Sequence, residues 1–154
     1  MEVFVARQPI FDKEQKVFAY ELLFRSGLDH TSFQQTDGDK ATSSVITSSF
    51  YTIGMESLTG GKRAFINFTK NLLINETATL LPKELLTVEI LENVEPEDSI
   101  INACKKLKKM GYVLALDDFV FEEKFQPLIE LADIIKVDFT LSDEEERAAI
   151  LKRI

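Results

Sequence analysis

Residues 85–119 read LLTVEILENVEPEDSIINACKKLKKMGYVLALDDF, in which two apolar segments flank an amphipathic one. The apolar segments, 85–91 and 112–117, are short and rich in branched side chains, as β-strands are. Between them, residues 97–110 carry apolar side chains at helical spacing, and Gly111 follows where a helix commonly ends. The stretch therefore predicts a strand–helix–strand unit.

The same alternation extends over most of the chain. Further apolar runs lie at 3–10, 16–24, 64–68 and 133–139, with helical patterns at 38–55 and 142–153. Alternating strands and helices indicate an α/β fold with a mostly parallel sheet, either doubly wound or part of a (β/α)₈ barrel. No phosphate-binding glycine fingerprint supports the doubly wound alternative.

Length limits the barrel. The chain has 154 residues, whereas a complete (β/α)₈ barrel typically needs about 250. We therefore expect a single domain over residues 1–154, an incomplete TIM-like barrel of about six strands and about five helices, truncated at its C-terminal end. The exposed edge at 133–139 should be shielded by the helix at 142–153 or by a second copy of the chain.

Composition excludes several functional classes. The 18 Lys and Arg residues against 26 Asp and Glu residues give a formal net charge of −8, which argues against a nucleic-acid polymer as partner. No secretory signal or long apolar segment is present, so we expect a cytoplasmic protein with no membrane association.

Two reactive residue types each occur once. Cys104 stands alone on an apolar helical face and should be a buried structural residue. His30 lies in a polar stretch without a neighbouring nucleophile and is not assigned a catalytic role.

Most of the apolar strands carry a solitary polar residue in or near their C-terminal half. These residues are Glu21, Asn67, Glu89, the pair Asp117-Asp118, and Lys136. An unpaired charge buried in a strand costs several kcal/mol, so their recurrence suggests one shared site. In a parallel barrel, the C-terminal ends of the strands converge on one mouth.

The chemistry of this set points to a divalent metal ion. Carboxylate and amide oxygens without His or Cys suit Mg²⁺ or Mn²⁺ better than zinc. Such ions clamp and activate phosphate esters, and a nearby lysine can neutralise charge or orient a water. The residues thus indicate metal-assisted phosphoryl transfer or phosphodiester hydrolysis. A structural alternative is that Lys136 merely pairs with Glu89 or Asp117 and that Asp118 caps the following segment.

Motifs of a known family occur in order at these positions. They are Gln8-Pro9-Ile10, Tyr20-Glu21-Leu22-Leu23-Phe24-Arg25, Ile66-Asn67-Phe68, Glu89-Ile90-Leu91-Glu92, Leu116-Asp117-Asp118-Phe119 and Ile135-Lys136-Val137-Asp138. This pattern resembles the EAL domains that hydrolyse the bacterial second messenger cyclic di-GMP. The segments ARQPIFD and YELLFR are especially similar to proteins in which an EAL domain, often a degenerate one, precedes an HDOD output domain.

The resemblance implies a role for each matching residue. Glu21, Asn67, Glu89 and Asp117 would ligate a divalent metal, Asp118 a second one, and Lys136 would help position the attacking water. Gln8 and Arg25 would contact the dinucleotide, Arg25 through charge-assisted bonds to a phosphate.

The chain departs from the family pattern in three places. Leu22 replaces the signature alanine beside Glu21. Val120 and Phe121 replace a Gly- and Ser/Thr-rich loop, and β-branched residues resist the positive φ that glycine permits. Nothing after Lys136 matches the further glutamate and glutamine of the family's last strands. We therefore expect inefficient hydrolysis.

Three hypotheses for the function follow. The leading one is a degenerate, non-catalytic EAL domain that senses a ligand or binds a protein, with an HDOD-type output domain or a homodimer as its expected associations. The alternative is a Mg²⁺- or Mn²⁺-dependent cyclic di-GMP phosphodiesterase, in which Glu21 and Lys136 serve catalysis, complete only in a longer chain or a dimer. The third is a structural remnant that binds no nucleotide.

Overall fold

The computed structural model describes residues 3–26, 38–118, 122–137, 144–145 and 148. Its strands are β1 (Val3–Phe11), β2 (Val17–Ser26), β3 (Arg63–Phe68), β4 (Leu86–Ile90), β5 (Val113–Leu116) and β6 (Ile134–Ile135). They form one sheet in the order β1-β2-β3-β4-β5-β6. β1 pairs antiparallel with β2, and all later neighbours pair parallel. The predicted α/β class with six strands is confirmed.

Helices connect the parallel strands. They are α1 (Gly38–Thr52), α2 (Met55–Thr59), α3 (Lys70–Ile74), α4 (Asp98–Met110) and α5 (Gln126–Leu131), with short 3₁₀ turns η1 (Thr77–Leu80) and η2 (Glu123–Phe125). The single helix predicted over 38–55 is wrong in extent. The structure divides it into α1, which ends at Thr52, and α2, which begins at Met55, because Gly54 between them has a φ of 85° that favours glycine. The helix predicted at 97–110 is confirmed and ends at Gly111.

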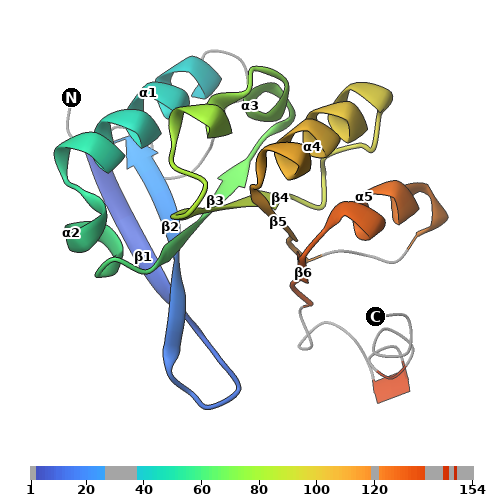
Figure 1. Cartoon of the computed structure of the whole chain (residues 1–154), viewed down its shortest axis with the longest axis horizontal. Coiled ribbons are helices and arrows are strands. Elements are labelled where there is room, and N and C mark those ends of the chain that lie inside the picture. Colours follow the sequence, from blue (N-terminus) through green and yellow to red (C-terminus); the bar gives the residue numbers. More distant parts are fainter. Residues whose placement is uncertain (1–2, 27–37, 119–121, 138–143, 146–147, 149–154) are drawn as a thin grey trace.

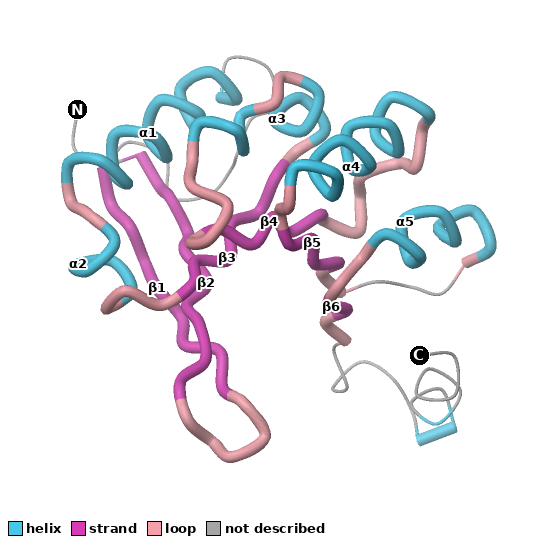
Figure 2. Tube along the Cα trace, in the orientation of Figure 1, coloured by secondary structure: helices cyan, strands magenta, loops and turns pink. Residues whose placement is uncertain are grey.

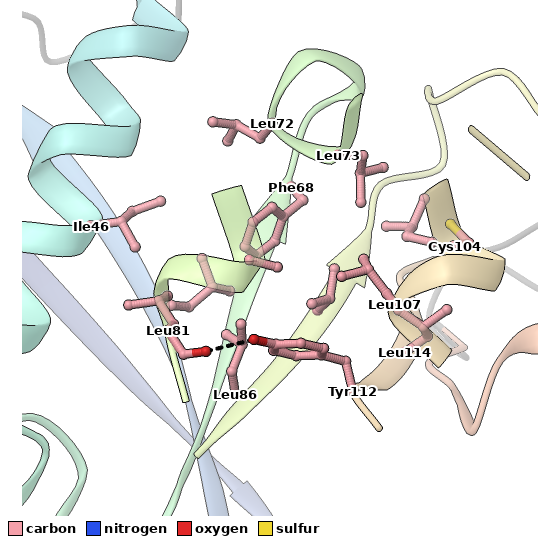
Figure 3. Close-up of a cluster of buried hydrophobic side chains, with 14 of the residues drawn as sticks. Ile46, Phe68, Leu72, Leu73, Leu81, Leu86, Cys104, Leu107, Tyr112 and Leu114 are labelled. Atoms are coloured by element: carbon pink, nitrogen blue, oxygen red, sulfur yellow. Dashed lines mark hydrogen bonds between the residues drawn. The ribbon is translucent and has the colours of Figure 1, made fainter. Parts of the chain in front are cut away.

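Helices α1, α3, α4 and α5 lie along one face of the curved sheet (Figure 1). The main core lies between them and the sheet, where Phe68 and Leu114 of the strands pack with Ile46, Cys104 and Leu107 of the helices (Figure 3). Cys104 is fully buried, as predicted. One buried polar contact crosses this core, because the Tyr112 hydroxyl donates to the Leu81 carbonyl oxygen at 2.7 Å.

The opposite face of the sheet differs in character. Its buried apolar cluster contains Ala19, Phe65 and Ala115, with Ile10 and Ile134 packed against it. No helix among the described residues covers this face (Figure 2). The sheet therefore offers a second, much less apolar side on which polar groups can gather.

Some predictions fall outside the described residues. His30 does, and so does most of the helix expected at 142–153, so the shielding of the edge at 133–139 stays a prediction. Within the described part of the chain, no helix has the length and apolar character needed to cross a membrane.

Candidate functional site

Side chains alternate between the two faces of each strand, and this alternation gathers the site. Leu22, Ile66, Val88, Leu116 and Ile135 pack in or against the core under the helices. The residues next to them in sequence therefore face the other way. Those residues are Glu21 on β2, Asn67 on β3, Glu89 on β4, Asp117 directly after β5, and Lys136 directly after β6.

Backbone hydrogen bonds hold the two residues that lie just beyond the strand ends. The Asp117 amide donates to the Ile90 carbonyl oxygen at 3.0 Å, and the Lys136 amide donates to the Leu116 carbonyl oxygen at 2.8 Å. Both bonds continue the parallel ladder for one more residue. Asp117 and Lys136 are thus positioned by the sheet even though neither belongs to a strand.

Three carboxylates meet at this edge. One oxygen from each of Glu21, Glu89 and Asp117 lies within 4.8 Å of the others. The Lys136 ammonium contacts all three, at 3.6 Å from Glu21, 3.3 Å from Glu89 and 3.1 Å from Asp117. Lys136 therefore does pair with Glu89 and Asp117, as the structural alternative expects. It also pairs with Glu21, so its ammonium is shared by all three carboxylates.

Burial dominates the electrostatics of Glu89, whose side chain is fully inaccessible to solvent. Burial raises the pKa of Glu89 to about 7, opposed by the Lys136 ammonium and reinforced by the Glu21 and Asp117 charges. Burial alone would lower the pKa of Lys136, but the carboxylates of Glu89, Glu21 and Asp117 outweigh it and raise that pKa. Lys136 therefore stays charged, and Glu89 carries the least favourable negative charge of the group.

The Asn67 side chain completes the cluster. Its Nδ2 donates to Glu21 Oε1 at 3.4 Å, while its Oδ1 is buried and has no hydrogen-bond partner among the residues that the structure describes. A buried carbonyl oxygen that lacks a donor is costly, and a metal ion would satisfy it. Three carboxylates and an amide oxygen make a hard donor set that suits Mg²⁺, Mn²⁺ or Ca²⁺. The residues thus fit a divalent ion.

The remaining predicted site residues lie nearby in the sheet or at its edge. Gln8 on β1 is exposed and lies directly opposite Glu21 in the strand register. Arg25 on β2 pairs with Phe4 through the backbone, and its side chain is outside the described part of the chain. Asp118 is exposed with a φ of 49°, in the left-handed region, and does not belong to the group of three converging carboxylates.

Two findings bear on positions that the sequence left open. Leu22 is buried in the core under the helices, so its added volume is taken up on the face away from the site. Thr87 was missed. It lies two residues before Glu89 on the same strand, and therefore on the same face, with its buried hydroxyl unpartnered among the described residues. Its polar character within LLTVEIL was the signal that could have identified it.

No family model matches the chain, but curated relatives do. It is 44% identical over 157 residues to the uncharacterised protein YuxH of Bacillus subtilis, covering 99% of this chain and 38% of the relative. It is 38% identical over 135 residues to the cyclic di-GMP phosphodiesterase CdgJ of Vibrio cholerae, covering 88% of this chain and 31% of the relative. The chain thus spans about a third of the length of these relatives.

Solved structures share the fold. The EAL enzyme Bd1971, in a form with cAMP and cyclic di-GMP bound, superposes with a TM-score of 0.71 at 17% identity, covering 99% of this chain and 51% of that one. The YkuI protein of Bacillus subtilis, with an EAL domain in complex with its substrate cyclic di-GMP and calcium, gives 0.66 at 20% identity, covering 98% and 46%. The incomplete EAL-type barrel predicted from the sequence is confirmed. The chain thus has the fold of EAL domains, and its motifs occur in the order in which EAL domains have them.

Proposed function

We propose that this chain is the cyclic di-GMP-binding domain of a bacterial signalling protein, and that it binds the dinucleotide with a divalent ion but hydrolyses it inefficiently. The observation that carries the proposal is the convergence of Glu21, Glu89 and Asp117 at one edge of the sheet, with their oxygens within 4.8 Å. Carboxylates gathered this closely repel one another, and a bound divalent ion would relieve the negative charge that Lys136 alone leaves uncompensated.

Each site residue has a place in this proposal. Glu21, Asn67, Glu89 and Asp117 would hold one Mg²⁺ or Mn²⁺ ion, and Asp118 would hold a second. When bound, such an ion neutralises phosphate charge and lowers the pKa of a coordinated water. Gln8, exposed beside Glu21 in the register, would contact the dinucleotide together with Arg25.

Two relatives support the ligand. CdgJ, which is 38% identical to this chain, is a cyclic di-GMP phosphodiesterase. The YkuI structure contains cyclic di-GMP and calcium. Both observations concern those proteins, and they make cyclic di-GMP with a divalent ion the first ligand pair to test on this chain.

Inefficient hydrolysis is proposed because of the segment after Asp118. Val120 and Phe121 occupy the place of the Gly- and Ser/Thr-rich loop of the family. Val and Phe disfavour the positive φ on which that loop depends. The domain would then report dinucleotide binding to a protein partner or to an HDOD-type output domain in the cytoplasm, as a monomer or a homodimer.

A working phosphodiesterase is the second candidate. It is favoured by the retention of Glu21, Asn67, Glu89 and Asp117 together with Lys136, whose ammonium lies 3.1–3.6 Å from the three carboxylates. In this reading, Glu21 holds the metal and Lys136 orients the attacking water.

Calorimetric titration of cyclic di-GMP into the chain, with Mn²⁺ or with a chelator, tests the proposal, and chromatography follows the nucleotide. We expect saturable heat only with Mn²⁺, weaker binding by Arg25→Ala, and intact cyclic dinucleotide at the end. The Asp133→Asn variant is the control, because Asp133 pairs with Lys108 outside the site. Linear dinucleotide formed at enzymatic rates would replace the leading proposal by the second candidate. Absence of binding heat with Mn²⁺ would overturn both.

A further inference from the structure

Lys136 lies where the three carboxylates of the site converge. Among the residues that the structure describes, it is the cation that forms ion pairs with Glu21, Glu89 and Asp117. It also lies within hydrogen-bonding reach of both Glu89 oxygens, at 3.4 and 3.3 Å. Its side chain is 29% exposed, so it is half-buried with its charged end directed into the cluster.

The ammonium and a divalent ion would compete for the same oxygens. A bound Mg²⁺ or Mn²⁺ ion needs carboxylate oxygens at about 2.1 Å, taken from the group that the ammonium now contacts. Two cations that share these oxygens repel each other strongly in a site with little solvent. Tight metal binding therefore requires Lys136 to withdraw from the cluster.

The metal-free protein nevertheless needs a cation here. The Glu89 side chain is fully buried, and a buried carboxylate without a partner is strongly destabilising. With three carboxylates and one ammonium, the cluster keeps its fold without metal but retains an excess of negative charge that attracts a divalent ion.

We propose that Lys136 is the internal counter-cation of the metal-free domain, and that a divalent ion displaces its ammonium from the carboxylates on binding. This role rests on the metal site of the proposed function and adds to it. Lys136 thereby lowers the metal affinity of the site while it preserves the fold when metal is absent.

The Lys136→Met variant separates the two effects, because methionine keeps most of the side-chain length without the charge. We expect the melting temperature in chelator to fall by on the order of 10 °C. We expect Mn²⁺ affinity, measured by calorimetry, to rise by about tenfold or more, and Mn²⁺ to raise the melting temperature more than it does in the parent. Lys108→Met is a matched control, since Lys108 is 30% exposed and pairs with Asp133 outside the site. It should leave Mn²⁺ affinity unchanged.

If Lys136→Met fails to fold without metal, the same substitution can be tested in a Glu89→Gln variant. In Glu89→Gln the buried charge is gone, so Glu89→Gln with Lys136→Met should fold in chelator. It should bind Mn²⁺ more tightly than Glu89→Gln alone. If the parent binds Mn²⁺ and removal of the lysine leaves the affinity equal or weaker in both backgrounds, the counter-cation role is overturned while the metal site stands. If no variant binds Mn²⁺, the metal site itself fails, and the counter-cation role fails with it.

Discussion

At the scale of the residue, Glu89 is the most constrained group in the site. It is fully buried, and it accepts hydrogen bonds from the Lys136 ammonium. The neighbouring Glu21 and Asp117 charges further raise its pKa. In the metal-free fold its proton is therefore held to higher pH than in the unfolded chain. This difference makes the stability of the domain depend on pH.

The pKa of Glu89 rises from 4.5 to about 7 on folding. Between these values the folded protein keeps a proton that the unfolded chain has lost, so the free energy of unfolding falls as pH rises through this window. The expected loss from this group is about 3 kcal/mol. Glu89→Gln should remove it, as measured by urea unfolding at several pH values in chelator.

The control for this prediction is Glu92→Gln, the same chemical change on an exposed side chain. It should preserve the pH dependence of the parent. Parallel loss of stability in Glu89→Gln and the parent between pH 4.5 and 7 would contradict the assigned role of burial at Glu89.

The residues of the site were largely predictable from the sequence, because an isolated charge in an apolar strand is conspicuous. Glu89 in LLTVEIL and Lys136 in ADIIKVDF are the clearest examples. What could not be predicted was the sharing of one ammonium among three carboxylates, since sequence spacing does not reveal how far a lysine side chain reaches. Thr87 was missed because a threonine is common in strands and carries no charge.

At the scale of the element, helix α4 was predicted well and the short helices were not. α4 has 13 residues with buried Ile100, Cys104 and Leu107 on one side, which is long enough to show a helical period. α3 and α5 have five and six residues and are too short to show one. β6 was predicted over 133–139; the structure has it at Ile134–Ile135, and residues 138–139 lie outside the described part of the chain.

The end of α4 gives a prediction about Gly111. Its φ of 98° lies beyond the left-handed region that L-residues tolerate, and a Cβ there would lie 3.3 Å from Lys83 Cδ. Gly111→Ala should lower the free energy of unfolding by about 2 kcal/mol. Gly60 ends α2 at a φ of 62° with open space around a Cβ, so Gly60→Ala should cost only about 1 kcal/mol. Urea unfolding compares the two, and an equal or reversed order would contradict this account of the α4 terminus.

At the scale of the whole molecule, the sheet separates two tasks. The face under the helices contains the main apolar core, and the other face gathers the polar site at the middle of β2, toward the C-terminal ends of β3 to β5, and beside β6. The division between the faces was predictable from the alternation of side chains along each strand. The gathering of the polar residues toward one end was predictable from the parallel strand order. Together they bring carboxylates from residue 21 to residue 117 within a few ångströms of one another.

Divalent-ion binding by Glu21, Glu89 and Asp117 can be followed by Mn²⁺ titration with electron paramagnetic resonance, since free Mn²⁺ gives a signal that binding broadens away. We predict saturable binding by the parent, weakened by about tenfold or more in Asp117→Asn and unchanged in Asp133→Asn, whose carboxylate pairs with Lys108 outside the site. Mn²⁺ binding that is absent from the parent, or equal in the parent and Asp117→Asn, would contradict divalent-ion binding by these carboxylates.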